Sequence, residues 1–83
     1  MDNSPHLVYK VSDLNEAAAI LCLSFDLLST EQDAKGRINF VFSDSPELQG
    51  VVKAYWNCTL QVTARYYGDA IKTLKNVIYK DRS

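Results

Sequence analysis

The stretch that decides the fold is residues 37–47, RINFVFSDSPE. Its first seven residues alternate so that Ile38, Phe40 and Phe42 fall on one face of an extended chain. Such period-two alternation is typical of a strand that buries one face. The pattern therefore predicts a strand over residues 37–43, with Phe40 at the centre of the buried face.

The end of this stretch predicts a helix that follows the strand directly. Ser45 offers a capping oxygen, Pro46 suits the first helical position, and Glu47 places a negative charge at the positive end of the helix dipole. We expect this helix to end near Asn57. Its buried residues should be Leu48, Val51, Val52 and Tyr55.

Upstream of the strand, residues 32–36 predict a polar turn in which Gly36 adopts a positive φ. Residues 25–31 can be extended, so the simplest arrangement is a hairpin with the strand over residues 37–43. Residues 7–11 also alternate, and they predict a further strand. The residues expected on its buried face are Leu7, Tyr9 and Val11.

A first helix is expected between these strands. Ser12 or Asp13 offers the N-cap oxygen, and Glu16, three residues after Asp13, completes a capping-box-like start. The alanine run over residues 17–19 would let this helix lie close against a sheet or another helix. Its apolar residues at helical spacing are Leu14, Ala17, Ala18, Leu21, Cys22 and Phe25.

The C-terminal third predicts a last helix, which Thr63 can cap. Gly68 lowers the stability of this helix by about 1 kcal/mol unless something packs closely there. The apolar stripe of the helix is Tyr67, Ala70, Ile71, Leu74, Val77 and Ile78.

Together these elements predict an α+β fold in a single domain over residues 1–83, in the order β-α-β-β-α-α. The small three-stranded sheet, antiparallel or mixed, should have its helices packed on one face. We expect residues 1–6 to form a flexible N-terminus.

Three motifs carry a family resemblance. They are Tyr9-Lys10-x-Ser12-Asp13-Leu14 before an alanine-rich helix, Phe40-Val41-Phe42 before an acid and a Ser-Pro-Glu-Leu helix start, and the closing Ala70-x-x-x-Leu74-Lys75-x-x-Ile78-Tyr79. Over about residues 8–80, the chain resembles a small domain-of-unknown-function family of bacterial and phage proteins. The resemblance implies a phage or mobile-element context and brings no assigned activity.

The composition argues against several classes of protein. Cys22 and Cys58 are too few for a disulfide framework in a chain that shows no secretory signal, and we expect both to be buried, reduced thiols. His6 is the single histidine, which leaves too few ligands for a metal site. The longest apolar run, residues 17–23, is far shorter than the ~20 residues of a membrane span. We therefore expect a cytoplasmic chain with no metal, cofactor or membrane partner.

No pattern points to catalysis. A nucleophilic Cys/His pair would require His6 to reach a cysteine, and the three glycines are too scattered to cradle a phosphate. Two carboxylate pairs lie at helix starts, where capping accounts for them: Asp13 with Glu16, and Asp44 with Glu47. We expect no enzymatic activity.

Charge is unevenly distributed along the chain, although the net charge is only −1. Residues 1–50 contain three basic and eight acidic residues, whereas residues 51–83 contain six basic and two acidic residues. An acidic first half and a basic second half favour self-association through opposite patches. The same distribution can also be balanced within one molecule.

The candidate binding surface is the basic, aromatic outer face of the last helix, with Trp56 as a second candidate at the edge of the core. Basic side chains can neutralise phosphates or acidic protein groups, and tyrosine can stack on unpaired bases. A solvated helix face that binds nothing gives the same pattern. The candidate residues are Trp56, Arg65, Tyr66, Lys72, Lys75, Tyr79, Lys80 and Arg82.

These observations predict a non-enzymatic interaction module that binds a protein partner or itself. The alternative is a small nucleic-acid-binding accessory protein that uses the basic last helix. The net charge of −1 counts against nucleic acid, because a domain that binds it is usually basic.

Overall fold

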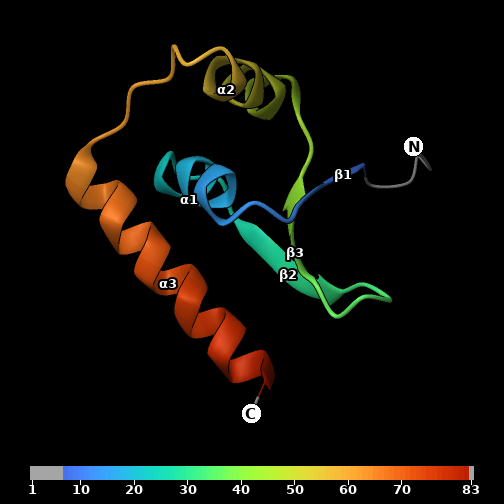
Figure 1. Cartoon of the computed structure of the whole chain (residues 1–83). Coiled ribbons are helices and arrows are strands. Elements are labelled where there is room, and N and C mark those ends of the chain that lie inside the picture. The colour runs from blue at the N-terminus through green and yellow to red at the C-terminus, as the bar shows by residue number, and fades with distance from the viewer. Residues whose placement is uncertain (1–6, 83) are drawn as a thin grey trace.

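The computed structural model describes residues 7–82, with only the backbone described for residues 81 and 82. In chain order the elements are β1 (Val8–Val11), α1 (Leu14–Cys22), β2 (Leu27–Gln32), β3 (Ile38–Ser43), α2 (Pro46–Trp56) and α3 (Ala64–Arg82) (Figure 1). This order confirms the predicted α+β fold. Residues 1–6, expected to be a flexible N-terminus, lie outside the described part of the chain.

The three strands form one antiparallel sheet in the order β1-β3-β2. The central strand is the one predicted from the alternation of residues 37–43, and Phe40 and Phe42 on its helix-covered face are fully buried. Figure 1 shows the three helices gathered on one side of this sheet. The predicted turn before β3 is present, because Gly36 has a φ of 81° and the Asp33 side chain accepts hydrogen bonds from two backbone N–H groups of the turn.

The helix α1 is the element around which the others pack. Residues 16–20 are all buried, and five consecutive residues of a helix point to every side of it. α1 contacts α2, α3 and β1, and it lies between α2 and α3 in Figure 1. The alanine run over residues 17–19 permits this close packing, as the sequence predicts.

The core combines side chains from five of the six elements. Its largest fully buried side chains are Phe40, Phe42, Ile20, Leu48 and Leu74. The predicted stripe of α3 is confirmed for five of its six residues, because Ala70 and Leu74 are buried and Tyr67, Ile71 and Ile78 pack against the core from its margin. Val77 is half-buried and is not among the residues that pack against the core.

Two boundaries differ from the predictions. The helix α1 stops at Cys22 because Ser24 adopts a left-handed conformation with a φ of 74°, so Phe25 packs on the core from a loop rather than from the helix. Leu7, predicted on the buried face of the first strand, precedes β1 and is largely exposed. It lies at the margin of the sheet, where its carbonyl accepts a hydrogen bond from the Asp44 N–H.

The end of α2 corrects the prediction that both cysteines are buried. Cys58 is exposed, and it follows the helix in a left-handed conformation with a φ of 60°. Its N–H bonds to the Tyr55 carbonyl, and the Thr59 N–H bonds to the Ala54 carbonyl, which is the Schellman arrangement that ends a helix. Cys22, by contrast, is half-buried beside the core.

The sheet face away from the helices is crossed by an ion pair. Lys10 Nζ lies 2.9 Å from Glu31 Oε1, although the two residues belong to the two outer strands. Lys10 lies opposite Val41 and Glu31 lies opposite Asn39, so the paired side chains pass over the central strand. This explains why Val41 is only 4% exposed on a face that no helix covers.

Candidate functional site

The described candidate residues are all exposed. On α3 these are Arg65, Tyr66, Lys72, Lys75, Tyr79 and Lys80, and on α2 the residue is Trp56. Arg82 is the last residue of α3, and its side chain lies outside the described part of the chain.

The structure divides the α3 candidates between two sides of the helix. Arg65, Lys72 and Tyr79 are separated by seven residues, which is close to two helical turns, and Lys75 lies one turn before Tyr79. We call these four residues the basic flank. Tyr66 lies on the other side of the buried stripe, and Thr73 and Lys80 follow it there at intervals of seven residues. Asp69 lies on the outward side of the helix, between Tyr66 and the basic flank.

This division has consequences because α3 crosses α1. One hollow is lined by Tyr66, Asp69, Ala70 and Thr73 of α3 and by residues at the end of α1, whereas a second hollow joins the basic flank to Leu14 at the start of α1. The two exposed tyrosines of α3 therefore face different surroundings. They cannot act together on one small ligand.

The basic flank carries three positively charged side chains that make no ion pair with other described residues. None of Arg65, Lys72 and Lys75 makes an ion pair with another side chain of the described residues. Asp69 lies four residues after Arg65 and three residues before Lys72, and its carboxylate makes no ion pair with either side chain. The basic flank is therefore available to neutralise acidic groups of another molecule.

The hollow beside the basic flank has a volume of about 230 Å³. Leu14 and Ile78 provide its apolar lining, and Lys75 and Tyr79 border it. Tyr79 is 69% exposed. Since the basic residues continue from this border along α3, the flank combines an apolar depression with a row of cations.

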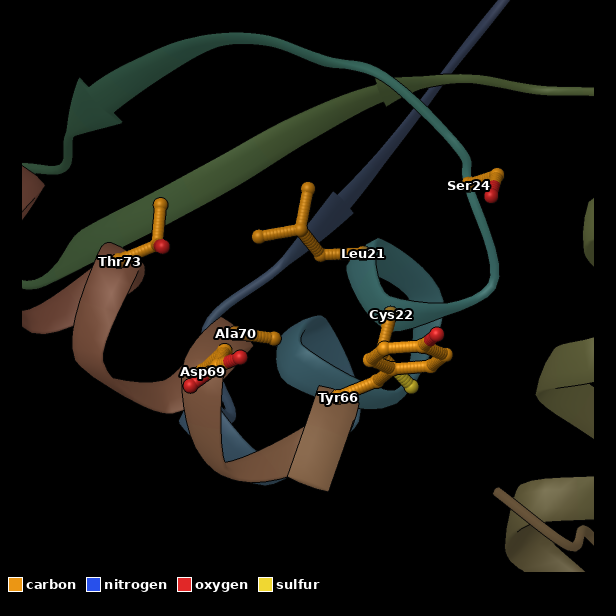
Figure 2. Close-up of a pocket in the computed structure, with 7 residues that line it drawn as sticks. All are labelled: Leu21, Cys22, Ser24, Tyr66, Asp69, Ala70 and Thr73. Atoms are coloured by element: carbon orange, nitrogen blue, oxygen red, sulfur yellow. The ribbon is translucent and has the colours of Figure 1, made fainter. Parts of the chain in front are cut away.

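The hollow on the other flank is wider and more open, with a volume of about 580 Å³. Its lining residues come from α3 and from the end of α1 and the loop that follows, as Figure 2 shows. The Cys22 thiol in this hollow donates a hydrogen bond of 3.3 Å to the Ala19 carbonyl, and burial raises the pKa of the thiol. A protonated thiol is a weak nucleophile, so this arrangement does not indicate cysteine chemistry.

Trp56 stands apart from the α3 candidates. It is the last residue of α2 and is 60% exposed. Its ring packs edge-on against Tyr55, with 5.2 Å between the ring centroids and an angle of 88° between the planes. Tyr55 is half-buried, but it is not among the residues that form the core or pack against it, so the prediction that Tyr55 faces the core is not confirmed.

Sequence reasoning missed a cluster of tyrosines and carboxylates at the start of α1. Glu16 is only 5% exposed, and its Oε2 accepts a hydrogen bond of 2.6 Å from the Tyr9 hydroxyl. Burial, and then the negative charge of Asp13, raise the pKa of Tyr67, and both also raise that of Tyr55. A raised pKa keeps these hydroxyls in the neutral form at ordinary pH.

The carboxylate pairs behave largely as predicted, with one correction. Asp13 caps α1 by accepting from the N–H groups of Asn15 and Glu16, and Asp44 accepts from the Ser45 N–H next to the α2 cap. Glu16 does not complete a capping box. Its carboxylate turns toward β1 to meet Tyr9, a contact that no local sequence signal indicates.

Among the described residues, no group of three or more His, Cys, Asp or Glu side chains could hold a metal ion. Within the same residues, no helix has the length and apolar character needed to span a membrane.

Comparison with known proteins identifies a family that the chain matches. A family model described as "Domain of unknown function (DUF5659)" matches residues 7–80. No curated protein and no solved structure matches the chain significantly. The family match confirms the resemblance to a small family of unknown function, whereas a bacterial or phage origin stays a prediction.

Proposed function

This chain belongs to the DUF5659 family, whose function is unknown, and we propose that it is a non-enzymatic interaction module. It binds a protein partner, or a second copy of itself, through the basic flank of α3. The observation that carries the proposal is the row of cations formed by Arg65, Lys72 and Lys75. These side chains make no ion pair within the described residues, and the row ends at the exposed Tyr79.

The physical basis is electrostatic complementarity. Exposed cations steer an acidic surface toward the helix, and a partly exposed tyrosine adds buried area once contact is made. The buried stripe of α3 packs against the core and α3 contacts α1, which favours a defined position of the flank. Rigid presentation lowers the entropy lost on binding.

Nucleic acid is the alternative partner. Tyr79 lies one helical turn from Lys75, and an exposed tyrosine beside cations can stack on an unpaired base. The net charge of −1 weighs against this alternative, because domains that bind nucleic acid usually carry an overall positive charge.

A cytoplasmic location, where both thiols stay reduced, is part of the proposal and is supported by the free cysteines. A phage or mobile-element context is proposed on the motifs that the chain shares with its family.

The proposed function is tested by co-purification from extracts of a cell that encodes the chain. The tagged domain is compared with a Lys72→Glu/Lys75→Glu variant and with a Lys35→Glu/Lys53→Glu control, which changes two exposed lysines outside α3 by the same charge. We expect a defined protein to be retained by wild type and control and lost from the α3 variant. Equal retention by all three forms would contradict the proposal.

Self-association is measured separately by light scattering over a range of concentrations. A mass that stays at 9.4 kDa for the wild type would restrict the proposal to a different protein as partner.

A further inference from the structure

We infer that the basic flank recognises an acidic amphipathic helix of a partner protein, and that one apolar side chain of this helix enters the hollow between Leu14 and Ile78. The inference rests on the proposed function. It adds the chemistry and the conformation of the segment that is bound.

The size and lining of the hollow suit a single apolar side chain. Its volume of about 230 Å³ is below the roughly 300–1,000 Å³ typical of small-molecule sites. Leu14 and Ile78 offer apolar contacts, and the ring of Tyr79 at the border can close over an inserted side chain. Tyrosine is enriched among the residues that dominate binding energy at interfaces.

The charge of the flank selects an acidic partner. Lys75 borders the hollow, and Lys72 and Arg65 continue from it toward the start of α3. At about 1.5 Å per residue, the row from Lys75 to Arg65 extends over about 15 Å. Carboxylates at helical spacing on a partner would meet each of these cations in turn, next to the apolar anchor.

The spacing along α3 favours a helix as the bound conformation. Arg65, Gly68, Lys72, Lys75 and Tyr79 follow one another at intervals of three and four residues, the pattern by which two helices pack lengthwise. The backbone N–H and C=O groups within α3 already form hydrogen bonds inside the helix. An extended peptide could therefore not pair with them as it does with the edge strand of a sheet. A helical partner satisfies its own backbone groups.

Gly68 lies in the middle of this row. A Cβ atom built on Gly68 would meet nothing within 4 Å, so packing within the chain does not require a glycine there. An exposed glycine inside a helix is unfavourable by about 1 kcal/mol relative to alanine. Its position in the row would allow the backbone of a partner helix to approach α3 closely.

The test uses fluorescence anisotropy with designed peptides of about 18 residues, a length that supports helix formation in water. The alanine-based peptides carry glutamates at alternating intervals of three and four residues. One version has a leucine at the N-terminal end of the glutamate row, and the other has it at the C-terminal end. Matched peptides replace the leucine by serine, or the glutamates by lysine. A single-stranded oligonucleotide is the remaining probe.

Tyr79→Ser and Tyr66→Ser form a matched pair of variants, because both tyrosines lie on α3 and their exposed fractions are 69% and 61%. We expect Tyr79→Ser to weaken binding of the leucine peptide about five- to tenfold, and Tyr66→Ser to change it less than about twofold. The serine peptide should bind wild type about five- to tenfold more weakly than the leucine peptide. The lysine peptide should not bind.

Two results would contradict the claim that an apolar side chain enters the hollow. One is equal affinity of wild type and Tyr79→Ser for the leucine peptide, and the other is equal affinity of wild type for the leucine and serine peptides. The proposed function would survive that result if co-purification still depended on Lys72 and Lys75. Absence of binding by both glutamate peptides would overturn the inference as a whole. Oligonucleotide binding that Lys72→Glu/Lys75→Glu abolishes, without peptide binding, would assign the flank to nucleic acid.

Discussion

The hydroxyl of Tyr9 donates a 2.6 Å hydrogen bond to Oε2 of Glu16, and this bond joins the first strand to the helix around which the domain packs. Glu16 is almost completely buried, so its carboxylate depends on protein groups rather than water for stabilisation. The hydrogen-bonded pair of Tyr9 and Glu16 is therefore part of the interface between β1 and α1.

Tyr9→Phe should lower the free energy of unfolding by about 1.5–3 kcal/mol, because it removes the donor and leaves a buried carboxylate without that bond. Urea denaturation measures the change. Tyr66→Phe is the control, since the Tyr66 ring is exposed and its substitution should change stability by less than about 0.5 kcal/mol. Equal stabilities of Tyr9→Phe and wild type would contradict a stabilising role for the bond.

Stability should decrease at alkaline pH. Burial, and then the hydrogen bond to Glu16, raise the pKa of Tyr9 well above its ordinary value of 10.0. The folded state therefore keeps a proton that the unfolded chain releases near pH 10, so this contribution is complete below that pH and is lost as the pH rises above it. Thermal unfolding from pH 8 to 11.5 measures the decrease, and the curve for Tyr9→Phe should fall less steeply.

Cys58→Gly should stabilise the domain by about 0.5–1 kcal/mol. Cys58 holds a φ of 60° after α2, and a side chain in this left-handed region is unfavourable by about 1–2 kcal/mol. Greater freedom of glycine in the unfolded chain offsets part of the gain. The control is Cys58→Ala, which keeps the Cβ atom and should bring no gain in a urea titration. A less stable Cys58→Gly would show that the thiol makes contacts that matter.

Gly50→Ala and Gly68→Ala should each stabilise the domain by about 0.5–1 kcal/mol, because both glycines lie inside helices and a Cβ atom at either meets nothing within 4 Å. The two variants should differ in binding. Only Gly68→Ala should weaken binding of the leucine peptide, because Gly68 lies in the row that faces the partner helix. Equal peptide affinities of the two variants would argue against close approach at Gly68.

Much of the fold follows from the sequence, because its signals are local. The alternation around Phe40, the caps at Asp13 and Ser45, and the apolar stripe of α3 each depend on residues two to four positions apart. The element order and the central strand were predictable for this reason. The exposure of the described α3 candidates was predictable as well, because a helix with one buried stripe exposes its other sides.

Only the tertiary structure decided how those residues combine. Glu16 was indistinguishable from a capping residue until β1 brought Tyr9 against it, and the outer residues of α3 formed a single group until the crossing of α1 divided them. The hollow beside Tyr79 exists because Leu14 lies more than 60 positions earlier in the chain yet beside it in space. Helical periodicity fixes which residues share a side of one helix, whereas the surroundings of each side depend on contacts between elements distant in sequence.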